Sequence, residues 1–246
     1  MQQVKVVAII QARMGSTRLP GKVLRDLEGE TVLARVVNRL RRTHLIGELL
    51  VATTDRPADD VIVAECRRCS VPVCRGDEQD VLDRYYRAAQ LVKAEVVVRI
   101  TADCPLIDAE IADKTVAAFL EARPDYASNV LIRTYPRGLD TEVTSFDALA
   151  RVWREARKPY EREHVTPYIY EHPADFRLVA VTGDADHSAH RWTVDTPEDL
   201  EFVRKIYAQL RDSATFSWRD VLDLFDREPE LMALNRFVVQ KSLHES

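Results

Sequence analysis

Residues 11–22, with the sequence QARMGSTRLPGK, combine small polar residues with positive charge. The segment holds two of the seven glycines of the chain and three cations, Arg13, Arg18 and Lys22. In such a loop, backbone N–H groups can surround phosphate oxygens while the cations neutralise their charge. The spacing is not that of a P-loop, because five residues separate Gly15 from Gly21 and Val23 follows the lysine. The sequence therefore predicts a polyphosphate site here, with a solvated basic turn as the alternative.

Two aspartates lie where a sheet could bring them to this loop. Asp103 comes just after the apolar run at 95–101, and Asp195 lies between the apolar residues at 191–194 and an acidic helix start. Magnesium is usually bound by one or two carboxylates together with phosphate and water. The pair therefore predicts a Mg²⁺ site, with a turn aspartate and a helix-start aspartate as the alternatives.

Two further segments, 135–142 and 160–166, are dense in groups that hydrogen-bond to sugar hydroxyls or carboxylates. The candidate acceptor-binding residues in them are Arg137, Asp140, Glu142, Glu163 and His164. A solvated charged surface is the alternative.

Two other patterns carry less weight. Cys66 and Cys69 with Cys74 resemble a zinc arrangement, but no fourth ligand has a suitable spacing. Asp184 and Asp186 match the Asp-x-Asp of metal-dependent glycosyltransferases, but they lie in a turn rich in glycine, histidine and serine.

The elements that must position these residues follow from hydrophobic periodicity. In the first half the expected strands are 4–12, 48–54, 71–74 and 95–101, and the expected helices are 31–44, 57–68, 80–93 and 108–121. Arginines 35, 39, 41 and 42 are expected on the outer face of the first helix. Strands that alternate with helices in this way indicate an α/β fold with a mainly parallel sheet. Ligands of such sheets bind at the carboxyl ends of the strands, where both the loop and Asp103 are expected.

The second half is less regular. The expected strands are 126–130, 139–143, 176–181 and 191–194, and the expected helices are 147–157, 161–171, 197–210 with Thr196 as its cap, and a tail at 218–236. We expect one domain over residues 1–246, with an inserted lobe at about 130–175 that forms the acceptor pocket and part of a homodimer contact.

Composition excludes several classes of protein. The chain has 246 residues, 46% of them apolar, and a formal net charge of −5, which excludes a generally cationic nucleic-acid binder. No apolar run approaches the ~20 residues that span a bilayer. Four cysteines are too few for a disulfide scaffold. The first residues, MQQVKVVAIIQA, lack the features of a cleavable signal, so we expect a cytoplasmic location and no membrane partner.

The segment 9–24 resembles the signature loop of the sugar cytidylyltransferases. That family includes the Kdo and acylneuraminate types and, most similar to this chain, the spore coat polysaccharide biosynthesis protein F group. Segments 100–108, 136–142, 161–167 and 192–199 match the last group in the same order, so the resemblance covers roughly residues 4–205.

The resemblance implies a nucleotide-diphospho-sugar transferase fold, which is GT-A-like and Rossmann-like. It also implies Mg²⁺-dependent transfer of a cytidylyl group from CTP to a small, acidic or modified sugar, with release of pyrophosphate. The implied catalytic residues are Arg13, Lys22, Asp103 and Asp195, the last two being the metal carboxylates. The implied nucleotide-binding residues are Gln11, Ala12, Arg13, Gly15, Ser16, Arg18, Lys22, Thr53, Gly76 and Asp103. A homodimer is implied by the Kdo and acylneuraminate enzymes.

Two other functions fit the same residues. A glycosyltransferase of the same fold would use a nucleotide-sugar donor and release a nucleoside diphosphate. A non-catalytic nucleotide-binding module would bind CTP without turnover.

Overall fold

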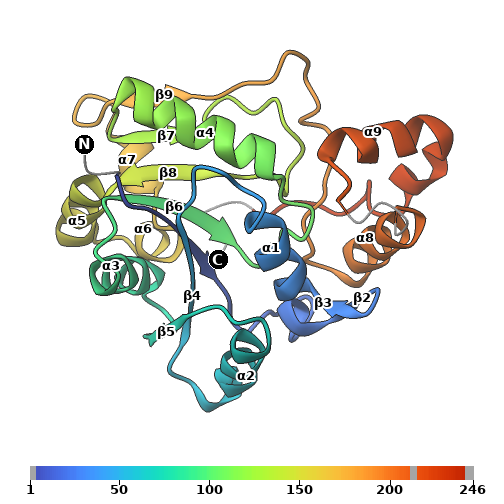
Figure 1. The fold of residues 1–246 in the computed structure, drawn as a ribbon, viewed down its shortest axis with the longest axis horizontal. Coiled ribbons are helices and arrows are strands. Elements are labelled where there is room, and N and C mark those ends of the chain that lie inside the picture. The colour runs from blue at the N-terminus through green and yellow to red at the C-terminus, as the bar shows by residue number, and fades with distance from the viewer. Residues whose placement is uncertain (1–3, 211–214, 242–246) are drawn as a thin grey trace.

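A single seven-stranded sheet forms the centre of the molecule in the computed structural model, which describes residues 4–210 and 215–241 (Figure 1). The strands, in spatial order, are β5 (Val73–Gly76), β4 (Glu48–Thr54), β1 (Val6–Gln11), β6 (Val96–Thr101), β8 (Glu142–Ser145), β7 (Tyr126–Ser128) and β9 (Leu178–Ala180). The first four of these run parallel to one another, β8 is antiparallel to both its neighbours, and β9 is parallel to β7. The sheet is mixed and mainly parallel, which confirms the predicted α/β fold.

The central strand β1 is buried on both faces, as its unbroken apolar run predicts. Ala8 and Ile10 point into one core, and Val7 and Ile9 point into the other. The first core is covered by α1 (Val32–Leu40), α2 (Asp60–Arg68) and α4 (Ala109–Ala122). The second is covered by α3 (Val81–Leu91), α5 (Phe146–Glu155), α6 (Pro159–His164) and α7 (Pro167–Glu171). Full burial of each such aliphatic side chain stabilises the fold by about 1.5–3 kcal/mol.

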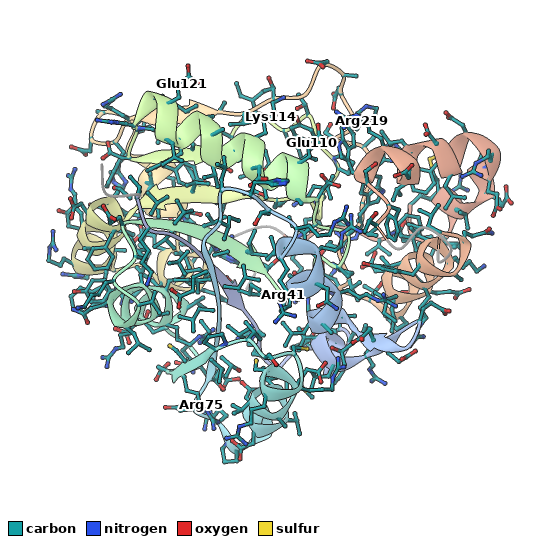
Figure 2. The ribbon with its side chains drawn as sticks, viewed as in Figure 1. Arg41, Arg75, Glu110, Lys114, Glu121 and Arg219 are labelled. Carbon is teal, nitrogen blue, oxygen red and sulfur yellow. The ribbon has the colours of Figure 1, made fainter. Side chains whose placement is uncertain are left out.

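A third apolar cluster lies beyond one end of the sheet (Figure 1). It packs α8 (Pro197–Gln209) and α9 (Trp218–Arg227) around the buried Trp192, next to the hairpin of β2 (Asp26–Leu27) and β3 (Glu30–Thr31). An ion pair of 2.6 Å between Arg219 and Glu110 ties α9 to α4, and Figure 2 shows the two side chains together. Three 3₁₀ helices complete the described elements: η1 (Lys22–Leu24), η2 (Pro57–Asp59) and η3 (Pro229–Ala233).

All the strands and helices predicted for the first half are present, with shifted ends. Thr196 caps α8 as predicted, accepting a hydrogen bond from the backbone N–H of Asp199. Among the described residues, none of the helices has the length and apolar character needed to cross a membrane.

Four predictions about local structure are wrong. Residues 161–171 form two helices, because Val165 has a φ of 72° and Pro167 starts α7. Residues 191–194 form no strand, since only an isolated bridge joins Arg191 to Arg137. Arg39 is buried, and its Nε donates to the backbone oxygen of Ile107 at 2.5 Å. The strand predicted at 139–143 begins only at residue 142.

Candidate active site

The loop after β1 folds back on itself through backbone hydrogen bonds. The N–H groups of Ser16 and Gly21 both donate to the carbonyl of Met14, at 2.8 and 3.1 Å, and Met14 N–H donates to Asp59 at 2.8 Å. Gly21 has a φ of 67°, a left-handed conformation that glycine adopts at low cost, and it begins η1. This turn directs Lys22 back across the carboxyl end of the sheet.

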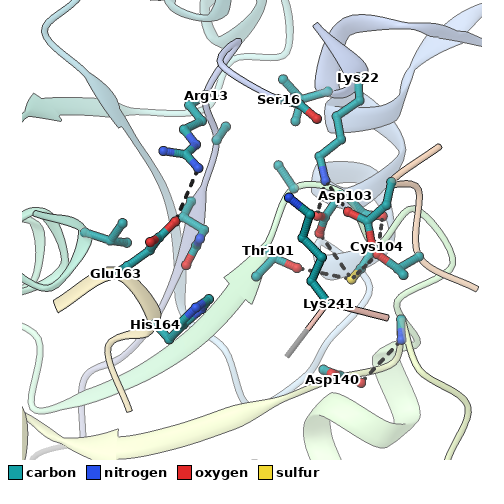
Figure 3. A pocket seen from close by; sticks show the side chains of 18 of the residues that line it. Arg13, Ser16, Lys22, Thr101, Asp103, Cys104, Asp140, Glu163, His164 and Lys241 are labelled. Atoms are coloured by element: carbon teal, nitrogen blue, oxygen red, sulfur yellow. Dashed lines mark hydrogen bonds and ion pairs between the residues drawn. The ribbon is translucent and has the colours of Figure 1, made fainter. Parts of the chain in front are cut away.

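Lys22 lies between the two aspartates that the sequence singles out. Its Nζ is 2.5 Å from Oδ2 of Asp103 and 2.7 Å from Oδ1 of Asp195 (Figure 3). The other oxygen of Asp195 accepts from Arg191 at 2.6 Å and lies 3.1 Å from Arg18. Burial alone would lower the pKa of Lys22, but the two negative charges beside it raise that pKa. The lysine therefore keeps its charge across the ordinary pH range.

Backbone bonds, rather than a strand, hold Asp195 beside Asp103. Trp192 N–H donates to the carbonyl of Arg137 at 2.7 Å, and Val194 N–H donates to the carbonyl of Asp103 at 2.8 Å. Gly138, with a φ of 108°, lets this segment approach closely, because a Cβ atom there would lie 2.7 Å from the carbonyl carbon of Trp192.

These groups open onto a pocket of about 470 Å³ (Figure 3). Of the predicted residues, those that line it are Gln11, Ala12, Arg13, Gly15, Ser16, Arg18, Lys22, Asp103, Arg137, Asp140, Glu163, His164 and Asp195. The pocket therefore brings together the phosphate loop, both aspartates and four of the five acceptor candidates.

Thr53, Gly76 and Glu142 are not among the lining residues. Thr53 is fully buried in β4, where its hydroxyl donates to Asp59. Gly76 ends β5, and a Cβ atom there would lie 3.1 Å from the side chain of Arg84, which lines the pocket. The structure therefore does not bring these three residues to the pocket surface, and their contact with a ligand stays a prediction.

Glu142 lies beneath the pocket instead of facing it. It is buried and forms an ion pair of 2.6 Å with Arg99, the residue opposite it on β6. It also accepts hydrogen bonds from the hydroxyl groups of Tyr126 at 2.9 Å and Thr166 at 3.1 Å. Burial alone would lower the pKa of Arg99, but the charge of Glu142 raises it. Glu142 thus positions a pocket arginine.

The remaining acceptor candidates differ in their partners. Asp140 accepts hydrogen bonds from both Nη groups of Arg133, at 2.7 and 2.9 Å. Glu163 forms an ion pair of 3.4 Å with Arg13. For Arg137, the described residues provide no side-chain hydrogen bond or ion pair. Burial, and then the charge of Arg133, lower the pKa of Arg137.

The pocket also has lining residues that sequence reasoning missed. They are Thr17, Val23, Val81, Arg84, Arg99, Thr101, Ala102, Cys104, Gly138, Thr193, Gln240 and Lys241. For two of them the sequence holds a signal that could have predicted a role in the site, namely a charged residue at a position expected to be buried. Arg99 is a charge inside the apolar run EVVVRIT, and Arg84 lies on the buried face of α3. The Nη1 group of Arg84 donates to the backbone carbonyls of Asp77 and Glu78, while its buried Nε has no partner within the described part of the chain.

The two weaker patterns do not contribute to this pocket. Neither Asp184 nor Asp186 lines it. Cys66, Cys69 and Cys74 are free thiols, and burial raises the pKa of Cys66 to about 12, which disfavours the thiolate that a metal would bind.

Residues 7–221 match the sequence model of a family described as cytidylyltransferase. The chain belongs to the cytidylyltransferase family. It is therefore a nucleotidyltransferase, as the resemblance of its phosphate loop implies. A cytidylyltransferase structure from Leptospira borgpetersenii is 34% identical, superimposes with a TM-score of 0.90, and covers 97% of this chain and 100% of its own.

Two other proteins are similar to this chain, one in sequence and one in fold. The spore coat polysaccharide biosynthesis protein SpsF of Bacillus subtilis is 35% identical over 92% of this chain and 95% of its own. A structure of CMP:2-keto-3-deoxy-manno-octonic acid synthetase, named as complexed with CTP, shares the fold with a TM-score of 0.66 at 20% identity, covering 83% of this chain and 99% of its own.

Proposed function

We propose that this protein transfers the cytidylyl group of CTP to a hydroxyl group of an acidic sugar, forming a CMP-sugar and releasing pyrophosphate. The observation that carries the proposal is that the cationic loop at 11–22 and the pair Asp103 and Asp195 meet in one pocket. Membership of the family supports cytidine as the base, as does the CTP named for the synthetase structure of the same fold. The name of the Bacillus relative supports a surface polysaccharide as the destination of the sugar.

The loop side of the pocket suits the triphosphate. Arg13, Ser16, Arg18 and Lys22 all line it, so three cations and one hydroxyl can contact phosphate oxygens. In nucleotidyl transfer, negative charge builds up on the leaving pyrophosphate, and pre-positioned cations stabilise that charge. Loss of one such group typically lowers the rate by ~10²–10³.

The pair Asp103 and Asp195 fits a divalent cation. Oxygens of both carboxylates lie within 2.7 Å of one atom, Lys22 Nζ, so they converge on one point. In residues 4–210 and 215–241 no group of three or more His, Cys, Asp and Glu side chains could hold a metal, so phosphate and water would complete the shell of a Mg²⁺ ion. When bound there, Mg²⁺ supplies positive charge to the phosphate oxygens. Lys22, freed from the aspartates, would pair with phosphate.

The other side of the pocket suits a sugar acid. Arg137 is half-buried without a carboxylate partner in the described chain, whereas Arg133 pairs with Asp140. A carboxylate on the acceptor would provide the missing partner for Arg137. Glu163 and His164 provide groups that can hydrogen-bond to sugar hydroxyls.

The reaction takes place between the CTP on the loop side of the pocket and the sugar on the other side. A sugar hydroxyl oxygen attacks the α-phosphorus of CTP, the new P–O bond forms, and the bond to the β-phosphate bridging oxygen breaks. Pyrophosphate carries away the electron pair of that bond, and the hydroxyl proton is released to water. Positioning and charge neutralisation account for the catalysis, and no covalent intermediate with the protein is needed.

The test is release of pyrophosphate from each of CTP, ATP, GTP and UTP, with Mg²⁺ and a panel of acidic and neutral sugars. We expect release only with CTP and an acidic sugar, and its loss when EDTA removes the metal. Release of a nucleoside diphosphate from a nucleotide sugar would instead indicate a glycosyltransferase. Binding of CTP without turnover on any sugar would indicate a non-catalytic module.

Arg137 provides the test of the acceptor side. In Arg137→Ala we expect KM for the sugar to rise about tenfold or more, because a charge-assisted hydrogen bond is lost, while KM for CTP stays within twofold. Arg133→Ala, which removes a neighbouring charge that already has a partner, is the matched control. A rise in KM for CTP alone would place the sugar elsewhere.

The lobe at about 130–175 is part of the same proposal, as the wall of the acceptor pocket and as a homodimer contact. Ile132 within it is 60% exposed and offers a position for the test. Sedimentation equilibrium of the wild type and of Ile132→Asp tests this: a monomeric wild type would exclude the dimer.

A further inference from the structure

The C-terminal segment, residues 235–241, is anchored to the residues that hold Asp195. Asn235 is buried, and its Nδ2 donates to the carbonyl of Arg191 at 3.0 Å and to Oδ1 of Asp199 at 2.9 Å. Arg191 in turn binds both Asp199 and Asp195. The beginning of the C-terminal segment is thus fixed next to the centre of the pocket.

From this anchor the segment runs along the pocket and contacts Arg18, which lines the pocket, and Arg191. Arg18 donates to the backbone oxygen of Val239 at 3.3 Å, and Nη1 of Arg191 donates to Oε1 of Gln240 at 2.5 Å. Gln240 and Lys241 both line the pocket, and Figure 3 shows the Lys241 side chain extending into it. The segment therefore forms part of the pocket wall.

Apolar burial does not account for this placement. Phe237 is 63% exposed and Val239 is 80% exposed, so neither side chain packs into a core. The contacts beyond the anchor are polar, and they are made by the guanidinium groups of Arg18, in the phosphate loop, and of Arg191. The segment also lies beyond residue 221, where the match to the family model ends.

Lys241 adds a positive charge where cations are already concentrated. Within the described residues it forms no ion pair, although it shares the pocket with Arg13, Arg18 and Lys22. The pocket lining holds seven lysine and arginine residues and four carboxylates, so positive charge is in excess there. A triphosphate has the charge to offset this excess, whereas a monophosphate has much less.

We propose that the C-terminal segment belongs to the nucleotide site, with Lys241 binding the polyphosphate chain of CTP and Gln240 holding the segment in place through Arg191. This inference rests on the function proposed above and assigns two further residues to it. Lys241 contacts substrate, whereas Gln240 is a positioning residue.

The test is calorimetric binding of CTP and CMP to the full-length protein and its variants, without acceptor. In Lys241→Ala we expect the affinity for CTP to fall about tenfold, as for loss of a charged hydrogen bond, and the affinity for CMP to stay within twofold. Lys241→Arg should retain most of the CTP affinity. Arg236→Ala is the matched control, because Arg236 is an exposed cation of the same segment that does not line the pocket, and it should leave both affinities unchanged.

Gln240→Ala separates positioning from a general effect of charge. It should weaken CTP binding severalfold in the wild type and add nothing further in the Lys241→Ala background, since both changes act through the same ammonium group. Fully additive effects would refute the positioning role.

Two outcomes would overturn the assignment of Lys241: unchanged CTP affinity in Lys241→Ala, or equal losses for CTP and CMP. Failure of the proposed function is distinguishable from these. In that case the wild type itself would bind CTP no more tightly than CMP, or would release no pyrophosphate with any sugar.

Discussion

Replacement of Lys22 by methionine removes a charge that lies between two carboxylates and keeps most of the side-chain volume. The Lys22 side chain is only 13% exposed, and Asp103 and Asp195 each approach its Nζ within 2.7 Å. Methionine leaves these carboxylates facing each other, with Arg18 and Arg191 as the remaining partners of Asp195. We expect the variant to fold and to be less stable than the wild type at pH 7.

The size of the loss follows from the pKa of Asp195. Burial alone would raise this pKa, but the charge of Lys22, then hydrogen bonds from Lys22 and Arg191, lower it from 3.8 to about 2. A change of that size corresponds to about 2.5 kcal/mol of folding free energy at neutral pH. Because Lys22 contributes most of the lowering, we expect Lys22→Met to cost about 2 kcal/mol.

The pH dependence has a definite sign. The pKa of Asp195 is lower in the folded protein than in the unfolded chain, so its stabilising contribution is fully present above pH 4. That contribution is lost as the pH falls toward 2. The difference between wild type and variant should therefore narrow to about 1 kcal/mol at pH 3.

The assay is urea unfolding at pH 7, 5 and 3, followed by circular dichroism. Lys205→Met is the matched control, because Lys205 is 48% exposed, pairs with an exposed Glu201 at 3.5 Å, and should change stability by less than about 0.5 kcal/mol. A variant as stable as the wild type at pH 7, or one with an undiminished loss at pH 3, would refute the reasoning. Magnesium chloride should stabilise the variant more than the wild type, because its aspartates no longer hold an ammonium group.

Three further predictions concern other parts of the site. Gly138→Ala should destabilise the protein by about 2 kcal/mol more than Gly29→Ala in thermal unfolding, because both glycines have a positive φ but only the first has backbone within 3 Å of the added Cβ; equal losses would contradict this. Glu142→Gln should lower the free energy of unfolding by about 3 kcal/mol, because Arg99 stays buried without its partner, and an unchanged urea midpoint would exclude that role. Asp103→Asn should keep the circular dichroism of the wild type and reduce pyrophosphate release by ~10²–10³, and retained turnover with wild-type Mg²⁺ dependence would remove Asp103 from the site.

The sequence alone was sufficient to predict the α/β architecture and the place of the phosphate loop. Both depend on local patterns. Short runs rich in β-branched residues, such as 95–101, are typical of buried strands, and the mixture of glycine, hydroxyl groups and cations at 11–22 suits an anion. The rule that strands of a parallel sheet end at a common edge then predicts that Asp103 lies near the loop, and the pocket contains both.

Only the tertiary structure decided the direction of individual side chains. Glu142 shares its segment with Asp140, which lines the pocket, yet the pairing of β8 with β6 places Glu142 opposite Arg99, where the two form a buried ion pair and only Arg99 lines the pocket. Residues 191–194 have the composition of a strand, but their N–H groups donate to the carbonyls of Arg137 and Asp103, which belong to two different loops. Register and loop packing depend on partners far away in the chain, so no local pattern reveals them.

For the same reason, the sequence could not predict the ion-pair partners of Lys22 or the position of the C-terminal segment in the pocket. As a loop cation, Lys22 could be assigned to phosphate from its neighbours, but its ion pairs with Asp103 and Asp195 join residues 81 and 173 positions apart. Gln240 and Lys241 carry no recognisable motif, and they reach the pocket only because Asn235 binds Arg191 and Asp199 in the fold. The sequence determined which chemistry the chain contains, whereas long-range packing decided which groups meet, because contacts between distant segments depend on the complete fold.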